Sequence, residues 1–82
     1  LEVWFRRHAE TRPARFVPEE LDDWKPGDVV FYRKEGASHP WHVAIVSDRR
    51  DEDGTPMVHD NFPPRTGSHR LERYGPIGSR FR

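Results

Sequence analysis

Two histidines stand in neighbouring apolar runs in the middle of the chain, and imidazole is the side chain best suited to proton transfer near neutral pH. His42 begins the run HVAIV, and His59 ends the run MVH. A histidine that acts as a general base is oriented by a second polar group on its other ring nitrogen, which fixes the tautomer. The pair therefore predicts an acid/base site with His42 and His59 as catalytic candidates, but such a site also needs a nucleophile.

The same residues allow two other interpretations. Imidazole and carboxylate groups are zinc ligands, so His39, His42, His59 and Asp60 are candidates for a metal site. Histidines of a small sheet also serve as hydrogen-bonded surface or boundary residues without any chemistry. The chain contains no cysteine, which excludes disulfides and thiolate metal sites. Spacing alone does not separate these alternatives.

Strand periodicity decides whether the two histidines can meet. Residues two apart in an extended strand share a face, so His42 and Val46 lie on one side of their strand. Met57, His59 and Asn61 likewise share a side. Opposed residues of an antiparallel hairpin have a constant sum of residue numbers, and sums of 101 (42 + 59) and 103 (42 + 61) both bring the histidines to one face. We therefore expect one of these two registers.

Either register requires a connection longer than a two-residue turn. A tight turn at Asp53 and Gly54 would give a sum of 107 and place His42 opposite Arg65. We therefore expect a loop over residues 49–55, with Gly54 at a positive φ angle.

The flanking segments predict the elements that carry this hairpin. The chain starts with the end of a helix, within residues 1–12, because Leu1, Trp4, Phe5 and His8 follow helical spacing. Two prolines make residues 13–23 an extended connector. The remaining elements are strands over 28–33, 41–47 and 57–61, then a short strand or helix near 70–74, then a C-terminal tail.

Composition bounds the class of protein. The 82 residues form at most one small domain, and with 33% hydrophobic residues we expect a folded chain with a thin core. Acidic and basic residues balance to a net charge of +0 and are spread along the chain, which favours neither a nucleic-acid nor a membrane partner. No signal peptide or membrane-spanning run is present, and the chain begins inside an apolar pattern without methionine. We therefore expect one partial domain over residues 1–82, with the sheet and tail in residues 24–82.

Four segments in sequence order resemble one family. They are LEVWFRRHAE, WKPGDVVFYR, HVAIVSDRRDEDGTPMVHDN and the terminal GPIGSRFR. Together they are similar to the C-terminal half of the domain-of-unknown-function family 1287, which belongs with the NlpC-type, papain-like amidases and peptidases of the cell wall.

This resemblance implies a fold and an activity. The fold would be α+β, a small antiparallel sheet with a short N-terminal helix, and would form the C-terminal half of a papain-like fold. The protein would be a periplasmic or secreted cysteine hydrolase that cleaves amide bonds of peptidoglycan peptides without metal or cofactor. The nucleophilic cysteine would lie on a helix upstream of Leu1, so the partners of this chain would be that N-terminal segment and the peptide substrate.

The resemblance also assigns roles to residues. His42 matches the base, and His59 matches the residue that orients it. Asp60 is inserted where the family pattern has His followed directly by Asn, so His59, Asp60 and Asn61 all stand as candidates for orienting His42. Trp41 and His39 would contact the substrate.

Three further departures from the family pattern are a Gly replaced by Ala44, a His replaced by Ser79 and a Tyr replaced by Phe81. The cysteine-bearing helix would cover the sheet face of His42, so this chain alone would expose an apolar patch at Ala44, Val46 and Met57.

Other residues receive structural interpretations. Asp28 follows the turn Pro26-Gly27 and is expected to accept hydrogen bonds from turn amides. His8 and His69 are expected at the surface, and Trp24 in the core or at its boundary. Two non-enzymatic alternatives remain, a small β-rich module that binds a peptide or glycan through Trp and Arg residues, and a purely structural fragment.

Overall fold

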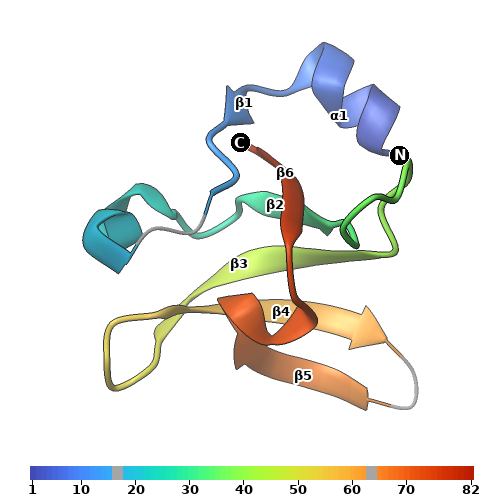
Figure 1. Ribbon diagram of the computed structural model, residues 1–82. Coiled ribbons are helices and arrows are strands. Elements are labelled where there is room, and N and C mark those ends of the chain that lie inside the picture. Colours follow the sequence, from blue (N-terminus) through green and yellow to red (C-terminus); the bar gives the residue numbers. More distant parts are fainter. Residues whose placement is uncertain (16–17, 63–64) are drawn as a thin grey trace.

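The computed structural model describes residues 1–15, 18–62 and 65–82, with the backbone alone at residues 18–20, 60–62, 65 and 66. Over these residues the chain forms an α-helix, two short 3-10 helices and six strands (Figure 1). In chain order they are α1 (Glu2–His8), β1 (Thr11–Arg12), η1 (Pro18–Asp23), β2 (Val29–Tyr32), β3 (His42–Arg50), β4 (Pro56–Phe62), β5 (Arg65–Arg70), η2 (Leu71–Tyr74) and β6 (Ile77–Phe81).

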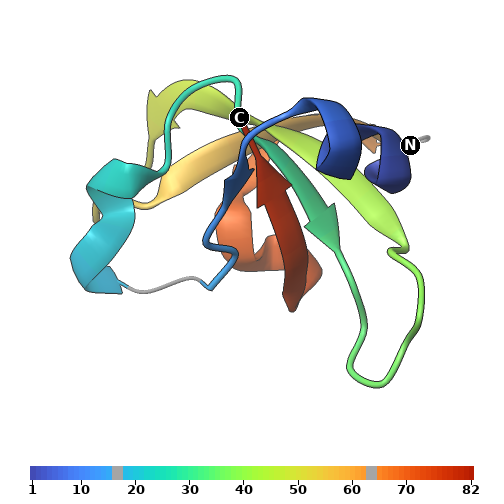
Figure 2. The same ribbon diagram turned by 90° about the horizontal axis from the view of Figure 1, so that it is seen from above.

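The described strands form one antiparallel sheet in the order β1-β6-β2-β3-β4-β5. The strand nearest the C-terminus, β6, lies between β1 and β2 and pairs with both. Figure 2 shows the sheet from above, with its strands fanned by the usual strand twist. The radius of gyration is 12.0 Å, close to the roughly 12 Å typical of a folded chain of this length.

One face of the sheet, here called the core face, carries the main hydrophobic core. Alternate residues of β2, β3 and β4 point to it, because side chains alternate along a strand. η2 packs on this face and is held there by the buried Tyr32 hydroxyl, which donates a 2.7 Å hydrogen bond to the Leu71 carbonyl oxygen. Each fully buried apolar side chain stabilises the fold by roughly 1.5 to 3 kcal/mol. The core consists of Trp24, Val30, Tyr32, Ala44, Val46, Val58 and Leu71, each at most 2% exposed.

The opposite face, here called the outer face, is covered in part by α1. Phe5 packs against Phe31 and Phe81, and the three ring centroids are 5.8 Å from one another. The hydroxyl of Ser79 donates a hydrogen bond to the Glu2 carboxylate of the helix. A seven-residue helix is not stable alone, so these contacts hold α1 in place. The tail residues Ser79 and Phe81, which depart from the family pattern, therefore both anchor the helix.

The expected helix is present, but only part of its stripe meets the sheet. Leu1 and Trp4 are 77% and 55% exposed. His8 stacks on the Trp4 ring at 4.6 Å and lies at the surface as predicted. None of the helices in the described ranges has the length and hydropathy needed to span a membrane.

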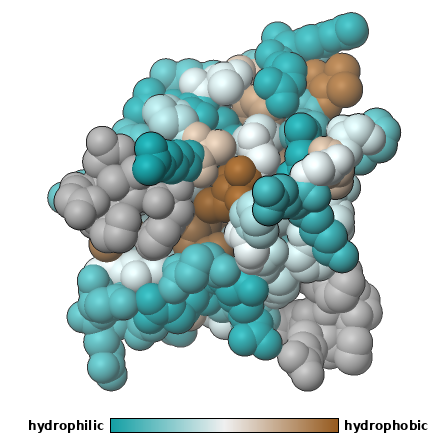
Figure 3. Space-filling view, viewed as in Figure 1, coloured by the Kyte–Doolittle hydropathy of each residue, from teal (hydrophilic) through white to brown (hydrophobic). Residues whose placement is uncertain are grey.

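Beyond α1 the outer face is open to solvent. Val43 and Ile45 of β3 are 36% and 51% exposed, whereas Ala44 and Val46 on the core face are each 2% exposed. The expected patch at Ala44, Val46 and Met57 is therefore wrong, because Ala44 and Val46 are buried on the core face and Met57 is half-buried on the other face. On the side shown in Figure 3, apolar surface reaches solvent only in small areas bordered by hydrophilic residues.

The expected α+β fold class, the C-terminal half of a papain-like fold, is wrong. The described chain is mainly β, and its six strands enclose a core of their own. The three predicted central strands are present. Residues 65–69, for which no strand was predicted, form most of β5, and residues 77–81, expected as a C-terminal tail, pair as β6. Glycine and arginine in these segments weaken their strand signal, so pairing with neighbouring strands decided their structure.

Candidate functional site

His42 begins β3 and is half-buried among aromatic rings on the core face. The nearest ring is that of Tyr74, whose centroid lies 4.2 Å from the imidazole centroid with 44° between the ring planes. Trp41 and Tyr32 follow at 5.3 and 5.8 Å. Tyr32 is also the register partner of His42 on β2. Rings from β2, η2 and the residue before β3 therefore hold the imidazole in place.

His59 lies on the other face of the sheet. It pairs with Ile45, and Val58 pairs with Val46, so the residue numbers of opposed pairs sum to 104. Because opposed residues share a face, His59 lies with Ile45 on the outer face and is exposed. The expected registers, 101 and 103, are wrong, and the structure does not bring His59 to His42.

The observed register follows from the valines. A shift by an odd number moves every side chain of a strand to the other face, and only an even sum can place both Val46 and Val58 in the core. Burying a valine stabilises the sheet, whereas His59 is readily solvated. The hydrophobic pattern therefore fixed the register against a pairing of the histidines.

The loop between β3 and β4 has the predicted glycine but is shorter than the expected 49–55, because β3 continues to Arg50. It spans residues 51–55, and Gly54 has a φ of +85°. The backbone amide of Asp51 donates a 2.8 Å hydrogen bond to the Thr55 carbonyl oxygen. The side chains of Asp60 and Asn61 lie outside the described part of the chain, so their predicted roles stay predictions.

A shallow cleft runs past His42 where the N-terminus meets the loop between β2 and β3. Trp41 is 39% exposed at its edge, and the Lys34 ammonium lies 5.4 Å from the Trp41 ring centroid. His39 is exposed in the same loop. The lining residues are Leu1, Phe31, Pro40, Trp41, His42 and Val43. Both predicted substrate-contact residues therefore lie close to His42 in the chain, and Trp41 shares its cleft.

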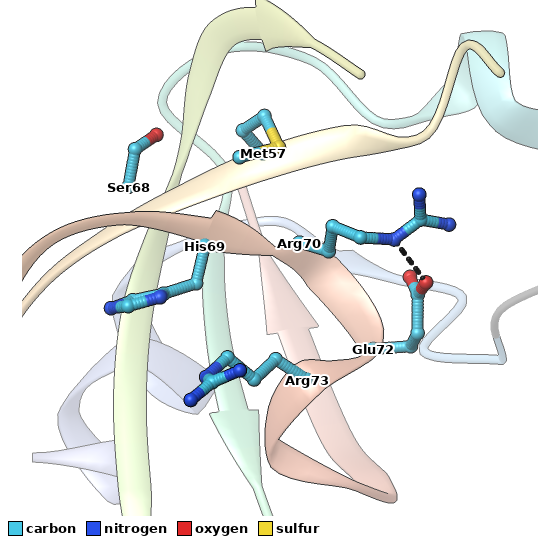
Figure 4. A pocket seen from close by; sticks show the side chains of 6 residues that line it. All are labelled: Met57, Ser68, His69, Arg70, Glu72 and Arg73. Atoms are coloured by element: carbon cyan, nitrogen blue, oxygen red, sulfur yellow. Dashed lines mark hydrogen bonds and ion pairs between the residues drawn. The ribbon is translucent and has the colours of Figure 1, made fainter. Parts of the chain in front are cut away.

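Sequence reasoning missed Tyr74 and misplaced His69. His69 pairs with Val58 and so faces the core rather than the surface. Its ring centroid lies 5.7 Å from that of Tyr74, edge to face. Figure 4 shows His69 and Arg73 on one side of β5 and Ser68 on the other. Strand alternation would have placed His69 on the same face as Val58, but only if residues 65–70 had been predicted as a strand.

The metal alternative finds no support among the described residues. No three His, Asp or Glu side chains in those ranges lie close enough to hold an ion. In particular His42 and His59 occupy opposite faces. The ligand set His39, His42 and His59 is therefore not assembled.

Asp28 has the structural role expected for it. The backbone amide of Lys25 donates a 3.1 Å hydrogen bond to its carboxylate. The Arg82 guanidinium binds the same carboxylate at 2.9 and 3.0 Å. Asp28 is fully buried. Because it binds both Lys25 and Arg82, it links the turn before β2 to residue 82.

Comparison with known proteins identifies the family but no activity. A family model described as "Domain of unknown function (DUF1287)" matches residues 1–82. "Uncharacterized protein YijF" of Escherichia coli (strain K12) is 41% identical over 62 residues, which are 76% of this chain and 28% of that protein. The chain thus spans little more than a quarter of the length of this relative. No solved structure matches the chain.

Proposed function

The chain belongs to the DUF1287 family, and we propose that it supplies the general base of a cysteine hydrolase that cleaves amide bonds in peptidoglycan peptides. His42 is that base. The nucleophilic cysteine belongs to a segment of the protein outside these 82 residues, and the enzyme works in the periplasm or outside the cell. The sequence motifs of the chain resemble those of NlpC-type cell-wall enzymes, and this resemblance supports the reaction class.

The observation that carries the proposal is the setting of His42. Its ring is held by Tyr74 on the core face, and the residue lines the cleft together with Trp41. A general base needs a fixed orientation.

The chemistry requires one histidine in two roles. His42 takes the thiol proton, and the thiolate then attacks the carbonyl carbon of the amide. The imidazolium returns this proton to the leaving amine as the C–N bond breaks, which leaves a thioester. His42 next takes a proton from water, whose oxygen attacks the thioester carbonyl. The C–S bond then breaks, the acid is released, and the imidazolium returns the proton to the sulfur. Trp41 and His39 contact the peptide at the edge of the cleft.

The test is digestion of purified muropeptides by the intact protein that carries this sequence, analysed by mass spectrometry. His42→Ala should lower kcat about a thousandfold or more, because proton transfer and thiolate formation are lost together. His8→Ala is the matched control, since His8 lies on the surface of α1, and it should leave kcat unchanged. Cleavage by His42→Ala at the wild-type rate would contradict the proposal.

A binding module without catalysis is the second candidate, and the open outer face favours it. Val43 and Ile45 form an exposed apolar strip that suits an apolar segment of a peptide. On this hypothesis the intact protein binds muropeptides without cleaving them, and Ile45→Ser weakens binding while His42→Ala does not. Calorimetric titration of both variants separates the two candidates.

A further inference from the structure

The Tyr74 ring occupies a central place on the core face. It contacts His42 of β3 at 4.2 Å and His69 of β5 at 5.7 Å between ring centroids. These strands are separated by β4 in the sheet, so one side chain reaches across three strands. Tyr32 and Trp41 complete its surroundings at 5.3 and 5.9 Å.

The position of Tyr74 is set by the backbone of η2. The Tyr32 hydroxyl holds the first residue of η2, Leu71, by its carbonyl oxygen. After Tyr74 the chain turns at Gly75, which has a φ of +87° and donates its amide hydrogen to the Glu72 carbonyl oxygen at 3.2 Å. Glycine adopts this φ without steric cost. The Tyr74 ring is therefore positioned by η2, which is fixed at both of its ends.

We propose that Tyr74 is the positioning residue of His42, the part that the sequence motif assigns to His59. The inference rests on the proposed role of His42 as the base. His59 faces the outer side of the sheet with Ile45, so it is not placed to orient His42. Tyr74 packs on the imidazole and limits its rotation, so that the ring keeps one orientation.

The geometry explains why a ring contact matters for rate. A base that is displaced by about 1 Å, or turned from the line of proton transfer, loses up to about a hundredfold in rate. His42 starts its strand, and the Trp41 and Tyr32 rings lie 5.3 and 5.8 Å from its ring. Tyr74 of η2 is the nearest ring, at 4.2 Å, and supplies the closest restraint.

The first measurement is spectroscopic and needs no activity. In the intact protein, labelled at histidine, the carbon-bound imidazole protons of His42 should carry ring-current shifts from Tyr74. Tyr74→Phe keeps the ring and should keep those shifts, whereas Tyr74→Leu should lose them. Arg73→Leu, in the same 3-10 helix, is the matched control and should leave them unchanged. If Tyr74→Leu does not fold, Tyr74→Met takes its place, because methionine fills irregular space without a ring.

The second measurement is muropeptide hydrolysis by the same variants. Tyr74→Leu should lower kcat by about ten- to a hundredfold with little change in KM, because the cleft lining is formed by other residues. Tyr74→Phe should restore kcat to within about twofold of wild type. Wild-type kcat in Tyr74→Leu overturns the inference, and so do unchanged His42 proton shifts in that variant. Absence of hydrolysis by wild-type protein would remove the proposed function instead, and the spectroscopic arm alone would then decide whether Tyr74 fixes the ring.

Discussion

Asp28 is a single residue on which two distant parts of the chain depend. Its buried carboxylate binds the Lys25 amide and the Arg82 guanidinium, and the Arg80 guanidinium lies 3.8 Å away. Arg80 is itself buried and packs over the Trp24 ring at 3.9 Å. Removing the charge of Asp28 would leave this buried cation less well compensated.

We expect Asp28→Asn to lower the free energy of unfolding by about 2 kcal/mol. This is less than the cost of breaking a fully buried ion pair, because the Arg82 side chain is 32% exposed and water compensates part of the loss. Asp22→Asn is the control, since Asp22 is exposed, and it should change stability by less than about 0.5 kcal/mol. Urea unfolding followed by tryptophan fluorescence measures both, and equal midpoints for the two variants would refute the expectation.

The roles of some residues could be predicted from their sequence neighbours, whereas the roles of others depend on strand pairing. Asp28 and Gly54 follow from turn chemistry within a few residues of sequence, and both were predicted correctly. His59 and Tyr74 depend on which strands pair and in which register. A change of one residue in the sum of paired positions sends His59 to the other face, and this choice was made by the burial of Val46 and Val58 rather than by the histidines.

At the scale of elements, the loop between β3 and β4 takes part in a cluster of charged side chains. Arg70 at the end of β5 binds Asp51 and Asp53 of the loop at 2.6 and 2.9 Å. It also binds Glu72 of η2 at 2.7 Å (Figure 4). The pKa of Asp53 is lowered from 3.8 to about 2, first by the Thr55 side-chain and backbone hydrogen bonds and then by Arg70. Three elements are thereby joined at one guanidinium.

The lowered pKa makes the contribution of Asp53 depend on pH in a defined direction. The folded state holds the charged form more tightly than the unfolded state, so the contribution is fully present above pH 3.8 and is lost as pH falls through about 2. Asp53→Asn should therefore be less stable than wild type at pH 5, with the difference shrinking as pH is lowered to 2. Urea midpoints at several pH values test this.

The control for the Asp53 experiment is Glu52→Gln in the same exposed loop. It removes a carboxylate from a neighbouring position, so it reports the general effect of lost charge on acid stability. A pH profile for Asp53→Asn that coincides with that of Glu52→Gln would show that the hydrogen bonds of Asp53 contribute nothing specific.

At the scale of the whole molecule, the sheet is completed by its final strand. β6 pairs with β1 through Thr11 and Arg12 and with β2 along Val29–Tyr32. It also carries Phe81, which packs against Phe5 of α1. Without β6, β1 would lose its strand pairing, and α1 would keep its contact with Phe31 of β2 but lose the one with Phe81.

We expect deletion of residues 77–82 to abolish cooperative unfolding, because β2 would lose one of its two neighbours and α1 part of its aromatic contact. Thermal melts by near-UV circular dichroism would show a broad or absent transition. Deletion of Leu1, which is 77% exposed, is the control and should leave the transition in place. A sharp melt of the β6 deletion near the wild-type temperature would contradict this role.

The place of β6 also sets an order of events during synthesis. The ribosome extrudes β1 and β2 early, yet the strand that must lie between them leaves the exit tunnel after every other strand of the sheet. Until then the nascent chain has an unpaired edge on β2, and such edges invite pairing with other chains. Crowded polysomes translating this sequence should therefore depend on chaperones that shield extended backbone until residues 77–82 emerge.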